Sequence, residues 1–144
     1  MTLKPRRPPV RRRAAAPASP GQKLMRLMAV KAARAAADKK GEDILLLHIG
    51  PVSGLADYLL IVSVTSPAHI DAVEESIRLS LKAAGLYPLH RDGRRSELWR
   101  VADYGGVLIH LMHPKAREFY ALEKVFHDAR PVRWEAAAAA RADA

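Results

Sequence analysis

Six histidines invite a metal-site hypothesis, and His110 and His113 form the closest pair. Residues three apart on a regular strand point to opposite faces, so this pair does not share one ion while the strand persists. A break at Pro114 would change that geometry. Structural or partner-contact histidines remain the favoured interpretation, because metal ligands usually cluster with supporting acids. The chain has no cysteine, which excludes disulfides and thiolate zinc sites. We therefore predict no metal and no cofactor.

The serines and glycines offer no recognised catalytic or phosphate-binding motif. Ser63, Ser66 and Ser96 are available as nucleophiles, and none lies in a Gly-x-Ser-x-Gly elbow. Residues 50–54, Gly-Pro-Val-Ser-Gly, lack the Gly-Lys-Ser/Thr ending of a phosphate-binding loop. Neither hydrolysis nor a nucleotide-binding loop is predicted.

The carboxylates Asp57 and Asp103 are isolated from each other in the sequence. Nucleotidyl transfer needs clustered carboxylates that hold metal ions. Asp57 precedes an expected strand, where a catalytic or metal-binding role competes with the commoner role of fixing a turn through backbone hydrogen bonds. We predict no catalytic residue.

Trp99 is the most informative aromatic residue. On a strand it shares a face with Val101, while Arg100 lies on the other face. A tryptophan on a peripheral hairpin belongs either to a small satellite core or to a binding surface, where tryptophan is strongly enriched among the energetically dominant residues. Both interpretations are open.

The net charge of +9 comes mainly from the N-terminal residues. Residues 1–23 contain seven basic residues and no acidic one, which leaves +2 for residues 24–144. Residues 1–22 also hold five of the ten prolines and little apolar material, which is typical of a disordered tail. Such a tail either contacts phosphate groups nonspecifically or is simply solvated. A nucleic-acid-binding protein is therefore one hypothesis for its function.

The apolar runs are far shorter than the roughly 20 residues that span a bilayer, so we expect a soluble protein without a membrane partner. The arginine-rich start without acids also resembles a transit peptide. Its prolines count against the amphipathic helix that such a peptide forms. We expect a bacterial cytoplasmic protein, with an organellar one as the alternative.

The elements that must position these residues alternate along the chain. The first expected helix ends before Gly41 and carries its apolar stripe on Leu24, Leu27, Met28 and Ala35. Residues 44–49 and 58–64 are continuous apolar runs, typical of central strands. Residues 66–84 predict a helix with Ser66 as its cap, Pro67 at its first turn and Gly85 at its end. Its expected buried stripe is Ile70, Val73, Ile77, Leu81 and Ala84.

Residues 86–90 predict a weak strand, and residues 91–95 a polar turn. Residues 97–102 and 107–112 flank a short glycine-bearing loop, which predicts an antiparallel hairpin. Pro114 begins an expected helix to about Phe126, with Phe119, Leu122, Val125 and Phe126 facing the sheet. We predict an α/β (α+β) domain over residues 23–128, with a mixed sheet of about five strands flanked by helices. Residues 129–144 are expected to form a C-terminal tail.

Several segments resemble the ribosomal silencing factor family, also called Iojap or RsfS. They are residues 55–63 (Leu-Ala-Asp-Tyr-Leu-Leu-Ile-Val-Ser), Trp99 with Asp103-Tyr104-Gly105, and residues 110–123 (His-Leu-Met-His-Pro-Lys-Ala-Arg-Glu-Phe-Tyr-Ala-Leu-Glu). The helical segment 31–42 is similar as well. The resemblance covers about residues 24–128, and the order and spacing of these motifs make it specific.

This resemblance implies a nucleotidyltransferase-like fold without catalytic apparatus and no enzyme activity. A nucleotidyltransferase-like enzyme or a nucleotide-binding protein is the alternative. The resemblance also implies binding to the large ribosomal subunit through large-subunit ribosomal protein fourteen, to which we expect the basic tail to add at most a weak contact with ribosomal RNA. The bound factor sterically blocks joining of the small subunit, which represses translation under nutrient limitation. Free family members can form homodimers.

The resemblance also implies a partner-binding surface on the hairpin and the following helix. The matching positions are Trp99, Asp103, Tyr104, His113, Glu118 and Tyr120. Two positions depart from the family pattern. Gly106 replaces a residue that is commonly acidic, and Val125-Phe126 replaces a common Leu-Trp pair. Gly106 thereby removes a charged contact to a basic partner.

Overall fold

The structure is a computed structural model that describes residues 20–93, 96 and 98–135. The predicted N-terminal tail therefore lies outside the described residues, except for residues 20–22. The elements follow in the order α1 (Pro20–Asp38), β1 (Glu42–His48), β2 (Tyr58–Ser63), α2 (Pro67–Ala83), β3 (His90–Asp92), β4 (Trp99–Asp103), β5 (Val107–Met112), α3 (Pro114–Tyr120), α4 (Leu122–Val125) and β6 (Arg130–Pro131). None of the helices in these residues is long and apolar enough to cross a membrane.

The strands form one mixed sheet in the order β3-β4-β5-β2-β1-β6. The central strands β2 and β5 pair in parallel, and every other neighbouring pair is antiparallel. All six residues of β2 are buried, as its continuous apolar run predicts. The predicted mixed sheet flanked by helices is confirmed, and the hairpin of β4 and β5 pairs as expected.

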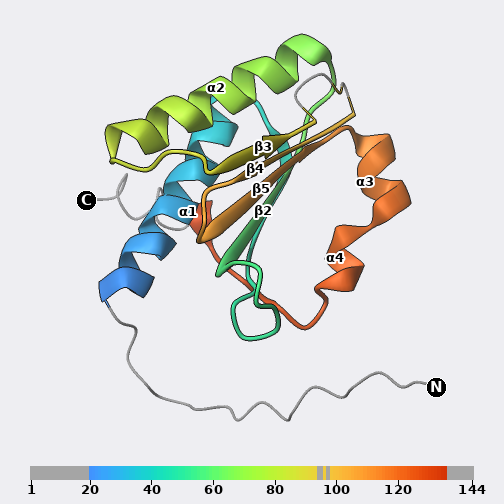
Figure 1. Cartoon of the computed structure of the whole chain (residues 1–144). Helices are drawn as coiled ribbons and strands as arrows, with labels where there is room; N and C mark the ends of the chain where they lie inside the picture. Colours follow the sequence, from blue (N-terminus) through green and yellow to red (C-terminus); the bar gives the residue numbers. More distant parts are fainter. Residues whose placement is uncertain (1–19, 94–95, 97, 136–144) are drawn as a thin grey trace, which may run out of the picture.

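Helices cover both faces of the sheet. Figure 1 shows α1 and α2 on one side of the strands and α3 with α4 on the other. Two apolar clusters result. The first lies beneath α1 and α2 and includes Leu60, Ile70 and Ile109, and the second lies towards α3 and α4 and includes Ile61, Met112 and Ala116. Alternate residues of β1, β2 and β5 supply the two clusters.

Helix α2 matches its sequence signals closely. Ser66 has extended backbone angles and its side chain accepts a hydrogen bond from the His69 backbone N–H, which caps the first turn. Ile70, Val73, Ile77 and Leu81 are buried as predicted. Ala84 lies beyond the helix as its C-cap and is exposed, so its predicted place in the stripe is wrong.

The predicted stripe of α1 is only partly right. Leu24 and Leu27 are 54% and 61% exposed, whereas Met28 and Ala35 are buried. The face that packs on the sheet is mainly alanine: Ala29, Ala32, Ala33 and Ala36 have no exposed area. Small side chains allow a helix to approach a sheet and a neighbouring helix closely. The buried face of α1 therefore carries small residues, and the larger Leu24 and Leu27 lie outside it. The helix also begins at Pro20, inside the segment predicted as tail.

Two further boundaries differ from the predictions. The edge strand β3 spans His90–Asp92, not residues 86–90. Its pairing with β4 starts where the Leu89 N–H donates to the Asp103 carbonyl. The strand ends before Gly93, whose φ is +74°. The expected single helix after Pro114 breaks at Ala121, which adopts a left-handed conformation with φ of 44°. Leu122 and Phe126 pack on the second cluster, whereas Phe119 and Val125 are exposed and do not face the sheet.

Part of the predicted C-terminal tail belongs to the fold. Residues Arg130 and Pro131 form β6 beside β1, and the Val132 N–H donates to the Leu46 carbonyl at 2.8 Å. Val132 is buried, and Trp134 packs against the first cluster. Residues 136–144 lie outside the described residues.

Candidate protein-binding surface

Exposed aromatic rings gather where β4 meets the end of α3. Trp99 is half-buried, and its ring centroid lies 4.5 Å from that of Tyr120, which in turn lies 4.8 Å from that of Phe119. Phe119 is 78% exposed and Tyr120 is 49% exposed. Leu98, the residue before Trp99, is exposed as well. We call Leu98, Trp99, Phe119 and Tyr120 the aromatic surface.

Trp99 is held in place by a hydrogen bond across the hairpin. Its Nε1–H donates to Nδ1 of His110 at 2.9 Å, so neutral His110 must carry its proton on Nε2. The two rings lie 5.8 Å apart between centroids. Burial lowers the pKa of His110 from 6.5 to about 4, which keeps Nδ1 free to accept. Trp99 therefore combines an anchored edge with a ring that remains half-accessible.

Acidification is expected to weaken the fold through His110. The unfolded chain binds a proton on this residue below pH 6.5, whereas the folded protein resists protonation until about pH 4. The contribution of His110 to the free energy of unfolding is therefore fully present above pH 6.5. It is lost as the pH falls from 6.5 to about 4, and the total loss is about 3 kcal/mol. Urea unfolding at several pH values should show a smaller loss in His110→Gln, whose side-chain oxygen also accepts from Trp99. An equal loss in both proteins would contradict this role.

Helix α3 carries two of the exposed rings, and its ends explain their placement. His113 caps the helix, with its Nδ1 accepting from the Lys115 backbone N–H at 3.1 Å, and Pro114 occupies the first turn. The left-handed Ala121 ends the helix directly after Tyr120. The chain then turns into α4, which leaves Phe119 and Tyr120 at the free end of α3.

Arg117 fixes α3 to the sheet. Its guanidinium donates to the Ser63 hydroxyl at 2.8 Å and the Asp43 carbonyl at 2.6 Å, and it pairs with Glu123 at 2.8 Å. Burial opposes the charge of Glu123, but hydrogen bonding, including that from Arg117, lowers its pKa overall. Sequence reasoning missed Arg117, although it lies within the quoted segment Ala-Arg-Glu-Phe-Tyr. A charged residue gives no sign in the sequence that its partners lie on three other elements, β1, β2 and α4.

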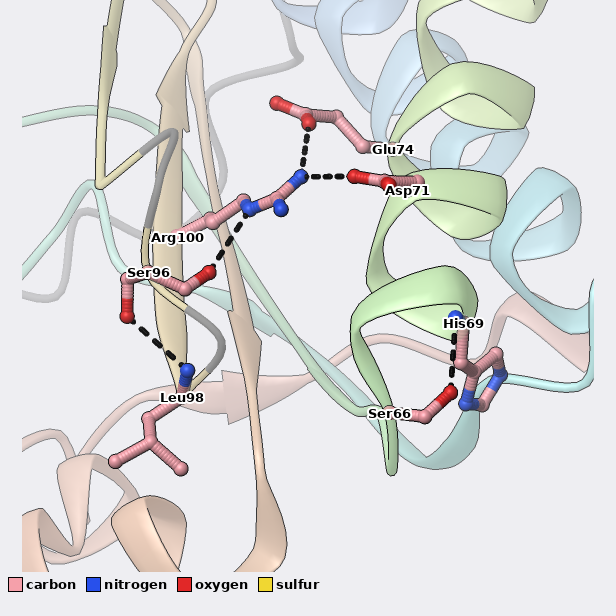
Figure 2. A network of polar contacts seen from close by, with 7 residues as sticks. All are labelled: Ser66, His69, Asp71, Glu74, Ser96, Leu98 and Arg100. Carbon is pink, nitrogen blue, oxygen red and sulfur yellow. Dashed lines mark hydrogen bonds and ion pairs between the residues drawn. The ribbon is translucent and has the colours of Figure 1, made fainter.

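Arg100 fixes β4 on the opposite face of the sheet (Figure 2). This arginine is only 8% exposed, and one nitrogen contacts both Asp71 at 2.7 Å and Glu74 at 2.9 Å on α2. Its Nε donates to the Ser96 carbonyl, while the Ser96 hydroxyl accepts from the backbone N–H groups of Leu98 and Trp99. The strand that presents Trp99 is therefore tied to α2 through its neighbour.

The six predicted partner-binding positions separate into two groups. Trp99 and Tyr120 are in contact, and Glu118 and His113 lie on or at the start of the same helix α3. Asp103 lies at the other end of β4, about 13 Å along the strand from Trp99. Its carboxylate accepts from the Gly105 N–H at 2.8 Å, which fixes the turn. Tyr104 is only 4% exposed and offers no ring surface to a partner.

Gly106 has a packing role in the structure. A Cβ at this position would lie 2.5 Å from Cγ of Met25 on α1, so Met25 occupies the space of a side chain here. A longer residue would have to displace that flexible side chain. In this chain, Met25 of α1 therefore fills the space that a larger residue at position 106 would need.

The candidate metal and catalytic positions remain separate. His110 contacts Trp99, whereas His113 caps α3. Within residues 20–93, 96 and 98–135 no group of three or more His, Asp or Glu side chains is placed to hold a metal ion. At Asp57, the backbone carbonyl accepts from Ile49 and Gly50, and its N–H donates to Gly106. These bonds fix the connection from β1 into β2.

The chain was compared with protein families and with known proteins. The family model described as "Ribosomal silencing factor during starvation" matches residues 22–144. The chain is 35% identical to the ribosomal silencing factor RsfS of Bacillus subtilis over 98 residues, covering 68% of this chain and 83% of the relative. It is 32% identical to a Mus musculus protein named "Mitochondrial assembly of ribosomal large subunit protein 1", covering 61% of this chain and 40% of that protein.

A solved structure shows the same architecture. The crystal structure of a Chromobacterium violaceum protein superposes with a TM-score of 0.69 at 27% identity. The match covers 72% of this chain and 86% of that chain.

Proposed function

The chain belongs to the ribosomal silencing factor family, and from that premise we propose that it binds the large ribosomal subunit through large-subunit ribosomal protein fourteen. In this proposal the bound protein sterically blocks joining of the small subunit and so represses translation under nutrient limitation. The family role is ribosome silencing and translation regulation. The name of the mouse relative, which refers to the large subunit, supports the choice of subunit.

The aromatic surface is the observation that carries the proposal. Its rings are fixed by α3 and by the bond between Trp99 and His110, so binding would cost little ordering of side chains. Aromatic residues are enriched among the residues that dominate binding energy. The exposed carboxylate of Glu118 on the same helix adds a charge that suits a basic ribosomal protein.

The first experiment is co-sedimentation of the full chain with separated ribosomal subunits. We expect the protein to pellet with the large subunit alone and to reduce joining when small subunits are added. Pelleting with the small subunit, or with neither, would overturn the proposal.

Phe119→Ala is expected to weaken large-subunit binding about tenfold, because it removes an exposed ring that contacts Tyr120. Its melting temperature should stay close to that of the parent protein. Leu79→Ala is the matched control, since Leu79 is an exposed apolar residue on α2, across the sheet from α3. Equal binding by both variants would remove Phe119 from the partner surface.

We further propose that the protein acts without catalysis and that the free form is a homodimer. The family names describe regulation and do not mention an enzymatic reaction. The alternative, a nucleotidyltransferase-like enzyme or nucleotide-binding protein, requires magnesium-dependent nucleotide binding, which calorimetry measures directly. A clear micromolar signal would favour that alternative. The bacterial relative supports a bacterial cytoplasmic location, and the mitochondrial name of the mouse relative marks the organellar alternative.

A further inference from the structure

The positive charge of this protein is concentrated at its beginning. Residues 1–37 contain ten of the 24 lysines and arginines and no acidic residue. Residues 38–144 contain the other 14 basic residues and all 15 acidic ones. Four of the first ten cations lie in α1, namely Lys23, Arg26, Lys31 and Arg34. The rest of the chain is therefore close to neutral.

Helix stability does not account for these cations. The N-terminal end of a helix favours acidic side chains, because the backbone dipole is positive there, and α1 has none in its first turn. Lys23 and Arg26 lie in its first two turns instead. None of the four α1 cations forms an ion pair with another residue in the part of the chain that the structure describes.

A second source of positive charge meets α1 at the edge of the sheet. Arg130 of β6 lies directly opposite His48 of β1, and His48 lies opposite Tyr58 of β2. Opposed residues share a sheet face, and Tyr58 belongs to the cluster beneath α1 and α2. Arg130 and His48 therefore lie on the side of the sheet that α1 covers. The His48 ring stacks on that of Tyr58, with centroids 4.9 Å apart.

The charges around His48 connect this edge to α1. Burial is the main cause that lowers the pKa of His48, and Asp57 opposes it. Arg26 and Arg130 lower the pKa further, as two cations close to the ring would. We call Lys23, Arg26, His48 and Arg130 the basic edge. Its cations come from α1 and β6, two elements far apart in the sequence.

We propose that the basic edge binds the phosphate backbone of RNA, as a second contact separate from the aromatic surface. Guanidinium groups pair with phosphate in a two-pronged geometry, and exposed Arg26 and Arg130 are available for this. Six further basic residues precede Pro20 in the sequence. The proposal rests on the proposed function only in taking the RNA to be ribosomal.

The test measures binding of the full chain to a short RNA duplex of mixed sequence across a range of salt concentrations. Arg26→Gln/Arg130→Gln should weaken binding about tenfold, as expected for two exposed ion pairs. The slope of log affinity against log salt should fall by about two, one for each phosphate contact. Lys39→Gln/Lys124→Gln is the matched control, because it removes the same charge from exposed positions outside the basic edge.

The outcomes separate this proposal from its competitors. An equal loss in the control pair would overturn it, since net charge alone would then explain binding. Unchanged RNA affinity with weaker large-subunit binding would also overturn it and assign the edge to a protein partner. Lys23→Gln/Arg26→Gln repeats the test with both changes on α1. It gives a result even if replacement of Arg130 disturbs the folding of β6. Trp99→Ala should retain RNA binding, so failure of the aromatic-surface proposal would be seen independently.

Discussion

Replacing Arg100 with methionine is expected to destabilise the fold by about 3 kcal/mol. The guanidinium is buried between β4 and α2, and its loss would leave Glu74, whose side chain is only 19% exposed, without its cation. Breaking a buried pair by removing one partner costs more than the pair contributes, because the remaining charge is poorly solvated. Methionine keeps much of the apolar stem, so the lost volume is small. Urea unfolding measures the difference.

The control for Arg100 is Arg78→Met, which removes the ion pair with Glu75 on the surface of α2. Exposed pairs contribute little, so the unfolding midpoint should change little. Combining Arg100→Met with Glu74→Met should recover part of the lost stability, because the second change removes the unpaired carboxylate. A single Arg100 variant as stable as the parent protein would show that the ion pairs do not hold β4 to α2.

Replacing Trp99 with alanine is expected to weaken large-subunit binding by about 2 kcal/mol or more, roughly 30-fold. The ring supports Tyr120 and lies at the centre of the aromatic surface, so its loss would remove contact area and loosen the neighbouring ring. Trp99 also packs against the second apolar cluster, and a stability loss will accompany the change. Binding must therefore be compared with melting temperature.

Trp99→Phe separates these two effects. Phenylalanine keeps an aromatic ring against Tyr120 and loses the hydrogen bond to His110. We expect it to bind more tightly than Trp99→Ala and to melt at an intermediate temperature. Normal subunit binding by a folded Trp99→Ala protein would show that Trp99 is only a core residue. The two interpretations that the sequence leaves open would then be decided in favour of packing.

The sequence by itself determined the elements whose signals are local. The cap at Ser66, the proline that follows it and the spacing from Ile70 to Leu81 define α2 within a short stretch of chain. The continuous apolar run of β2 marks a strand buried on both faces. The segments that resemble the ribosomal silencing factor family were likewise enough to identify it.

Tertiary structure decided the features whose partners are distant in the chain. Ala29, Ala32 and Ala36 are buried because close approach to the sheet favours small residues, and Leu24 and Leu27 stay exposed. The two-residue strand β6 exists only because β1 offers it an edge.

The candidate surfaces depend most on this long-range packing. Arg100 and Arg117 look like solvent-facing cations in the sequence, yet each is held by groups from other elements. Tyr104 looks available on its loop and is buried, whereas Phe119 looks like a core residue and is exposed. The periodicity of a helix gives the direction of a side chain relative to its neighbours. It does not show which side chains meet solvent. That depends on the end of α3 at Ala121 and on how the remaining elements pack around the helix.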